Sequence, residues 1–327
     1  MMTPSENTKK LILKVADYVI FPFIFVSALV MKKIRSYGLH RLPLTNATLR
    51  YVGLLPIVHH YYEPVVYAED LRHSLDDDRE ILGLDLNPEG QLALLEQFSY
   101  ADELRAIPMT SDDQLEYCYQ NGMFGAGDSE YFYNFIRHFK PKRIVEVGAG
   151  HSTLLARRAI EENLNNDPAY KCEHIVIEPF ENPWLEKLDV QVIRAQLQEC
   201  ELSIFENLQA NDILFFDTSH VIRPQGEVLF LMFSVLGRLN DGVLIHFHDI
   251  RTPKDYIERW VLEEQRLWTE QYFIEAFLVD NPKYEVIGAV HYMWRHYPEA
   301  VGDKCPILAT MPLKNPGSFW IRRLAAT

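Results

Sequence analysis

The sequence predicts an open α/β fold with a mostly parallel sheet, and three observations support this. The apolar run Ile144–Val147 passes into a glycine-rich turn and then into a helical pattern, which is a strand-turn-helix unit. Further short apolar runs recur at the rhythm of a parallel sheet. Polar residues end these runs, and ligands of open α/β sheets bind outside the carboxyl ends of the strands. A ligand site is therefore expected at that edge.

The later strand-like runs each end in a polar residue. They are His174–Ile177 with Glu178, Val190–Ile193 with Arg194, Ile213–Phe216 with Asp217, and Val243–Phe247 with His248 and Asp249. A long helix is expected over 258–278. Two closing strands are expected at 285–290 and 318–324, separated by a proline-containing loop.

The turn after Val147 has features of a cofactor site. Gly148 and Gly150 have no Cβ, so a ligand can lie against the backbone, and the following helix start offers N–H groups to it. Ser152 is expected to be the N-cap of that helix. A dinucleotide fingerprint would need a third glycine where Thr153 stands, so a nicotinamide or flavin cofactor is disfavoured.

The segment Glu146-Val-Gly148-Ala-Gly150 at a strand end resembles the first motif of the class I S-adenosylmethionine-dependent methyltransferases. The alternative is a glycine turn in some other α/β protein. The resemblance covers residues 122–327. It implies a Rossmann-like sheet of seven strands, mostly parallel, whose last-inserted strand is antiparallel. The residues expected to bind S-adenosylmethionine are Glu146, Gly148, Gly150, Ser152, Glu178 and Asp128.

Two of these expectations depend on position. Glu178 ends the second strand, where a carboxylate can accept both hydroxyls of the cofactor ribose. Asp128 begins the helix before the first strand, which closes over the cofactor in many class I methyltransferases. Asp128 is expected to reach the cofactor amino group, and the alternative is that it caps the helix.

The candidate catalytic residues are Asp217 and His220. A neutral hydroxyl is a poor nucleophile at pH 7, so methyl transfer to it needs a group that takes its proton. His220 is the candidate base. The alternatives are structural roles: Asp217 only orders its loop, and His220 hydrogen-bonds a backbone carbonyl.

A divalent cation is expected at Asp217, His248 and Asp249. The pattern resembles metal-dependent O-methyltransferases that modify macrolide sugars, where D-x-x-H and a carboxylate pair supply metal ligands and base. The resemblance implies a sugar as acceptor. His248 departs from that pattern because it replaces the first carboxylate of the pair. The cation is expected to be Mg or Mn; because an imidazole ligand makes magnesium less favoured, iron, zinc or no bound cation are the alternatives.

Charge restricts the partners. The net charge is -14, which argues against nucleic acid. Residues 1–43 differ, with seven basic and two acidic side chains around the apolar run Val15–Met31. This pattern predicts a helix that contacts a membrane surface through residues 9–35. The alternatives are packing on the catalytic domain or on a second subunit, which would give a homodimer.

Four scattered cysteines form no C-x-x-C pair, as expected for reduced thiols in a cytoplasmic protein. Peripheral attachment at the inner face of a membrane is the further expectation. The predicted parts are an N-terminal helix at 1–43, a mostly helical extension or lid at 44–121, and a catalytic domain at 122–327.

The sequence therefore predicts a methyltransferase that acts on a hydroxyl of a sugar or another small polyhydroxylated acceptor. One alternative is a metal-dependent hydroxylase or hydrolase on the same fold. The other is a non-catalytic protein that binds the cofactor or assists assembly.

Overall fold

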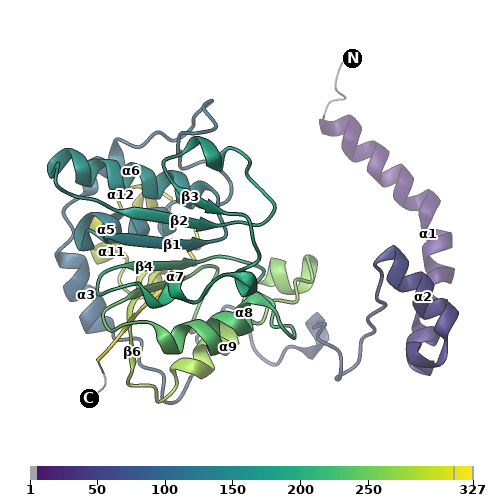
Figure 1. Ribbon diagram of the computed structural model, residues 1–327. Helices are drawn as coiled ribbons and strands as arrows, with labels where there is room; N and C mark the ends of the chain where they lie inside the picture. The colour runs from purple at the N-terminus through teal and green to yellow at the C-terminus, as the bar shows by residue number, and fades with distance from the viewer. Residues whose placement is uncertain (1–5, 312–313, 326–327) are drawn as a thin grey trace. The chain divides into compact units, whose positions relative to one another are not determined.

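The computed structural model describes residues 6–311 and 314–325. Residues 1–5, which belong to the predicted N-terminal segment, lie outside the described residues. The chain divides into two compact units, residues 1–72 with 259–267, and residues 73–258 with 268–327. The first contains α1 (Glu6–Tyr37) and α2 (Pro43–Val52), and the second contains the sheet and the other α-helices (Figure 1).

The second unit is built on a seven-stranded sheet in the order β3-β2-β1-β4-β5-β7-β6. The strands are β1 (Arg143–Val147), β2 (Glu173–Ile177), β3 (Gln191–Ile193), β4 (Ile213–Phe216), β5 (Leu244–Phe247), β6 (Tyr284–Ala289) and β7 (Phe319–Arg323). β7 pairs antiparallel with both β5 and β6, and the other pairs are parallel. The predicted sheet with one antiparallel inserted strand is confirmed.

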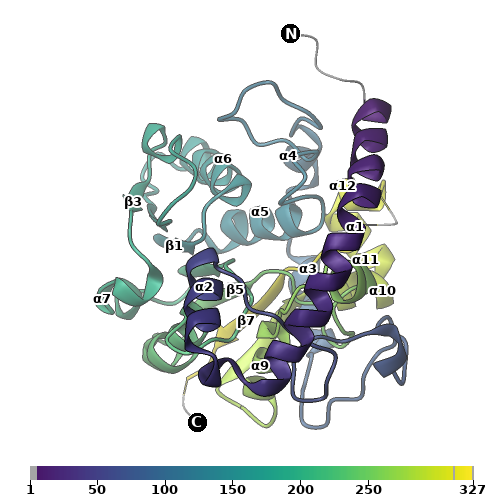
Figure 2. The ribbon, with the colours of Figure 1, turned by 90° about the vertical axis from the view of Figure 1, so that its right-hand side faces the viewer.

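Helices cover both faces of this sheet, which explains the continuous apolar strands. Successive side chains of a strand point to opposite faces. Ile144 and Phe215 pack with α5 (Asp128–Phe139) and α6 (His151–Asn166) in one core cluster. Val145 packs on the other face with residues of α7 (Ser203–Glu206), α8 (Glu227–Phe230) and α9 (Glu270–Leu278). Figures 1 and 2 show these layers on either side of the strands.

The predicted helix over 258–278 is wrong. Residues Arg259–Glu263 form a short π-helical turn, and α9 begins only at Glu270. The backbone N–H groups of Thr269 and Glu270 donate to the carbonyl of His220, at 2.9 and 3.1 Å. The contact with the loop that contains His220 therefore sets the start of α9. The spacing of apolar residues along the sequence does not reveal such a contact.

Two other segments differ from expectation. The extension contains α2, α3 (Pro88–Glu96) and α4 (Ala101–Arg105), but residues 53–87 have no α-helix and only the 3₁₀ turn Ala68–Asp70. The expected loop between the closing strands instead contains α10 (Val290–His296), α11 (Pro298–Lys304) and α12 (Pro306–Ala309). Pro298 and Pro306 of this segment occupy first-turn helix positions, where a missing N–H costs nothing.

We predict that Gly148→Ala destabilises the fold by about 3 kcal/mol. Gly148 has a φ of +83°, and a Cβ there would lie 1.8 Å from the backbone oxygen of Asp217. Gly150→Ala is the matched control, because nothing lies within 4 Å of its added Cβ. Urea unfolding measures both, and equal midpoints for the two variants would contradict the close approach.

Candidate functional site

The carboxyl ends of five strands bring the predicted site residues into one row. In four cases, the first residue after one strand donates its backbone N–H to the carbonyl oxygen of the last residue of the neighbouring strand. The pairs are Glu178 with Ile193 (3.1 Å), Gly148 with Ile177 (3.0 Å), Asp217 with Val147 (3.0 Å) and His248 with Phe216 (3.1 Å). Glu178, Gly148, Asp217 and His248 thus follow one another along the sheet edge where ligands of such folds bind.

The glycine turn leaves room for a ligand and presents a carboxylate beside it. Gly148 lies against the backbone of Asp217, whereas Gly150 faces open space. Glu178 is half-buried, and its Oε2 accepts the N–H of Ala149 at 3.4 Å. Its Oε1 accepts the N–H groups of Phe180 and Glu181, both at 3.0 Å. The backbone therefore holds the Glu178 carboxylate toward the turn, as a ribose-binding group requires.

Glu146 and Ser152 are predicted to bind the cofactor, and in the structure their side chains hydrogen-bond each other. Glu146 is fully buried and accepts hydrogen bonds from the Ser152 hydroxyl and from Nε2 of His174. Ser152 is not the N-cap, because α6 begins at His151 and the Thr153 hydroxyl oxygen accepts the N–H of Gly150. The two side chains satisfy one another beneath the turn, so they shape it from inside.

His220 lies in a buried cluster of carboxylates. Its Nδ1 is 2.8 Å from Oε2 of Glu270, and its Nε2 is 3.4 Å from Asp217 and 3.6 Å from Asp249. Burial alone would lower the pKa of His220, but hydrogen bonds with Asp217 and Glu270 raise it to about 10. At neutral pH this ring is held mostly as an imidazolium.

Glu270 was not among the predicted site residues; it is almost fully buried and contacts His220 from 50 positions along the chain. The N–H groups at the start of α9 and the Glu270 carboxylate both bind His220, through its carbonyl and its ring. The local sequence around Glu270 shows only an acidic residue in the first turn of a helix. Such a residue is usually explained by a favourable interaction with the helix dipole, so it does not indicate a site.

Two site residues have a left-handed backbone. His220 has a φ of +58° and Asp249 a φ of +55°, a region that non-glycine residues rarely adopt. Gly317 presses against Asp249, since a Cβ on Gly317 would lie 2.9 Å from the Asp249 Cα. Such strain persists only where surrounding contacts hold it, and it concentrates at functional sites.

The predicted metal ligands do not converge on a common point. Asp217 and Asp249 both approach His220, while Nε2 of His248 is 3.8 Å from Asp249. Among the described residues, no group of three or more His, Cys, Asp or Glu side chains is arranged to hold a metal ion. The arrangement does not fit the expected cation, so we derive no step through one.

Charge interactions link Asp217 and His248. Burial would raise the pKa of Asp217, but the charge of His248 and the hydrogen bond from His220 lower it. Burial likewise acts to lower the pKa of His248, and Asp217 and Asp249 raise it. Asp217 and Asp249 thus favour the charged form of His248, and the two imidazoles favour the charged form of Asp217.

Asp128 is buried, and its carboxylate binds backbone N–H groups. Its Oδ1 accepts the N–H groups of Gly317 and Ser318, at 2.8 and 2.6 Å. It therefore fastens the start of α5 to the segment that enters β7. Its contact with the cofactor amino group stays a prediction, which these hydrogen bonds do not support.

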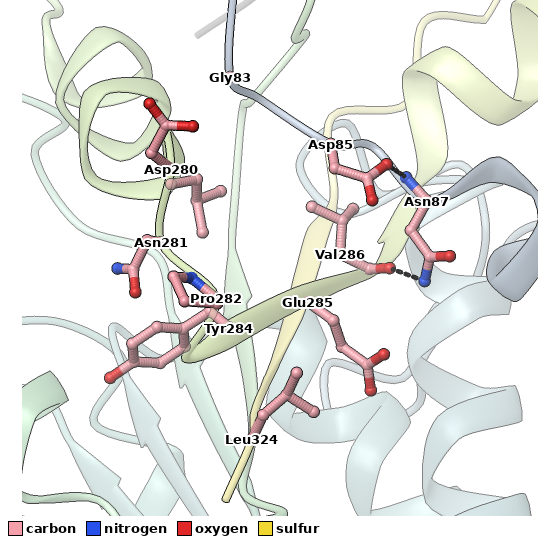
Figure 3. Close-up of a pocket in the computed structure, with 11 residues that line it drawn as sticks. Gly83, Asp85, Asn87, Asp280, Asn281, Pro282, Tyr284, Glu285, Val286 and Leu324 are labelled. Atoms are coloured by element: carbon pink, nitrogen blue, oxygen red, sulfur yellow. Dashed lines mark hydrogen bonds between the residues drawn. The ribbon is translucent and has the colours of Figure 1, made fainter. Parts of the chain in front are cut away.

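A cavity of about 530 Å³ lies at the other end of the strands. Tyr284 and Glu285 at the start of β6 line it, together with Asp85 and Asn87 (Figure 3). The Asn87 side chain donates to the carbonyl of Val286 at 3.0 Å. This cavity is remote from the carboxyl ends of the parallel strands, so it is separate from the site described above.

Comparisons with known proteins agree with this geometry. A family model described as a methyltransferase domain matches residues 145–250, which run from β1 to just beyond β5. An uncharacterized protein of Archaeoglobus fulgidus is 32% identical over 196 residues, which cover 56% of this chain and 86% of that protein.

A solved structure of an O-methyltransferase from Bacillus cereus in complex with SAH is also similar. It has 12% sequence identity and covers 71% of this chain and 91% of its own. Its TM-score of 0.36 is too low to support an argument by itself.

The chain therefore carries a methyltransferase domain of the S-adenosylmethionine-dependent type at residues 145–250. The methyltransferase domain match spans the glycine turn, Glu178, Asp217 and Asp249. The sheet order and its antiparallel inserted strand are those expected for the family. Its cofactor is S-adenosylmethionine, and the open space at Gly150 and the inward carboxylate of Glu178 fit that group.

We predict that Glu178→Gln weakens binding of S-adenosylhomocysteine by about 1–3 kcal/mol, because a charged acceptor is lost. Calorimetric titration measures this. Glu181→Gln is the matched control, since Glu181 is exposed and only its backbone takes part in the turn. Equal affinities in both variants would refute the ribose role of Glu178.

Proposed function

We propose that this enzyme transfers a methyl group to a hydroxyl oxygen of a sugar or another small polyhydroxylated acceptor. The observation that carries the proposal is the buried His220, which lies among three carboxylates one strand from the glycine turn. A hydroxyl must lose its proton during methyl transfer, and this histidine is a base with a matched set of partners.

The roles follow from the contacts. S-adenosylmethionine, when bound, supplies the electrophilic methyl group. Gly148, Gly150 and Glu178 would hold it at the sheet edge. Glu270 accepts Nδ1–H of His220, which presents Nε2 of the neutral ring to the acceptor hydroxyl. Nε2 takes the hydroxyl proton, and Asp217 and Asp249 then stabilise the imidazolium that forms.

We predict that kcat/KM rises about tenfold per pH unit through the neutral range and levels off near the pKa of His220, about 10. A base works in its deprotonated form, so a raised pKa moves the rise toward alkaline pH. Glu270→Gln removes one group that raises this pKa and is expected to shift the rise to lower pH. Initial rates with a hydroxylated acceptor over a pH series measure both.

His220→Gln is expected to lower kcat by about 10²–10⁴-fold while S-adenosylhomocysteine still binds. A pH-independent rate in the unaltered enzyme, or full activity in His220→Gln, would contradict the base role. A divalent cation at Asp217, His248 and Asp249 stays a prediction from the sequence. Chelation followed by addition of Mg or Mn tests it in the same assay.

We further propose that α1 contacts a membrane. The helix has 32 residues, and its segment Thr8–Tyr37 is long and apolar enough to cross a bilayer. Its apolar side chains are exposed, for example Phe21 and Phe23 at 63% and 73%. Basic residues stand at both ends of the apolar run, as in helices that bind anionic lipid. The four free cysteines agree with a reducing compartment.

We predict that the full chain floats with vesicles containing anionic lipid, and that Ile20→Asp with Ile24→Asp abolishes flotation. Two charges on the apolar run cost about 5 kcal/mol or more in a bilayer. Leu44→Asp is the control, because Leu44 is 84% exposed on α2, outside the run. A chain that forms dimers and stays with the aqueous fraction would instead favour α1 as a subunit contact.

A further inference from the structure

An acidic turn lies against a group of basic side chains in the second unit. Asp76 is 3.3 Å from Arg251, 3.5 Å from Lys254 and 3.6 Å from Arg295. Asp78 is 3.3 Å from Lys254 and 2.8 Å from His296. We call Arg251, Lys254 and Arg295 the cationic cluster. Three full positive charges therefore face two carboxylates.

The cationic cluster is at the same sheet edge as the methyl-transfer site. Arg251 stands two positions after Asp249, in the loop that follows β5, and Lys254 belongs to the same loop. Arg295 lies on α10, which directly follows β6. β5 and β6 both run antiparallel to β7, so their carboxyl ends are at one edge. An acceptor at His220 would thus have cationic groups on the side toward β6.

Arg251 has more donors than partners. Its side chain is 4% exposed, and its guanidinium makes two long hydrogen bonds to described residues, 3.3 Å to Asp76 and 3.4 Å to Nε2 of His291. Its Nε is buried and has no hydrogen-bond partner within residues 6–311 and 314–325. The five N–H groups of a buried guanidinium normally all donate hydrogen bonds. A buried N–H group without an acceptor costs free energy of folding. This guanidinium is suited to a ligand with several acceptor oxygens.

The charges of Arg251, Lys254 and Arg295 outweigh that of Asp76 at His291, whose Nε2 lies 3.4 Å from the Arg251 guanidinium. Burial lowers the pKa of His291 to about 3, and the charges of Arg251, Lys254 and Arg295 act in the same direction. Asp76 acts in the opposite direction but is outweighed. An additional anion would therefore be attracted to this place.

The acidic turn covers the cationic cluster as an irregular surface segment, which backbone hydrogen bonds of Arg79 with Pro253 and of Asp255 with Leu75 join to the loop after β5. Residues 71–87 contain no helix or strand, and the side chains of Asp76 and Asp78 are 59% and 39% exposed. Arg251 and Lys254 beneath them are at most 9% exposed. The buried cations belong to the folded domain, and the exposed carboxylates approach them from a surface segment.

We propose that Arg251, Lys254 and Arg295 form a subsite for a phosphate monoester on the acceptor, which Asp76 and Asp78 cover until the acceptor binds. A phosphate monoester carries up to two negative charges and three acceptor oxygens on one atom, so it can replace both carboxylates at once. The assignment of this phosphate to the acceptor rests on the proposed function. The anion subsite itself does not.

Calorimetric titration of the full chain with inorganic phosphate, at constant ionic strength, tests the subsite. Asp76→Asn with Asp78→Asn is expected to tighten phosphate binding about tenfold, because the internal competitor is removed. Asp77→Asn removes a charge from the same turn without breaking a described ion pair, and it is expected to change binding less than about twofold. Arg295→Gln, a half-exposed position, is expected to weaken it.

Several outcomes would overturn the subsite. They are no phosphate binding in any variant, unchanged affinity in the double variant, equal tightening by Asp77→Asn, or equal binding of acetate. A double variant that only melts at lower temperature would show the ion pairs to be structural. If the double variant does not fold, Asp76→Asn alone is expected to give about threefold tightening. Titration of the same samples with S-adenosylhomocysteine reports separately on the proposed function.

Discussion

The close approach of two chain segments at the carboxyl ends of β1 and β4 organises this molecule. Gly148 turns with a positive φ directly against the carbonyl of Asp217, where no side chain fits. This contact fixes the cofactor turn and the Asp217–His220 loop in one position relative to each other. Because the strands beside them are buried on both faces, neither segment can shift without disturbing the core.

Around that contact, the site is held mainly by buried charge. His220 receives one carboxylate from its own loop, one from the loop after β5 and one from α9. Buried charges persist only when paired, so the cluster ties three distant segments together while it sets the protonation of the ring. Positive φ angles at His220 and Asp249 show that the backbone is held in a costly conformation there. The side chains around His220 thus both stabilise the fold and set the protonation of the proposed base.

The acidic turn shows a second use of charge, at the border of the site. Asp76 and Asp78 cover cations that the domain leaves only partly satisfied, and they do so from a segment without regular structure. An enzyme for a phosphorylated acceptor would gain from such a cover, because the buried guanidinium of Arg251 is shielded until a better anion arrives.

The sequence alone determined the sheet, the glycine turn and the row of polar strand ends, since apolar runs, glycines and strand termini are local patterns. It predicted Glu178 and His220 at one edge because parallel strands end together. Ser152 was wrongly predicted as the N-cap of α6, and the hydrogen bond between Ser152 and Glu146 was not predicted, since local sequence does not say which groups bond each other in the interior. Glu270, the start of α9 and the pairing of Asp76 with Arg251 were decided only by the tertiary structure. These contacts join positions 49 or more residues apart, and the burial that gives them their energy exists only after the chain has folded.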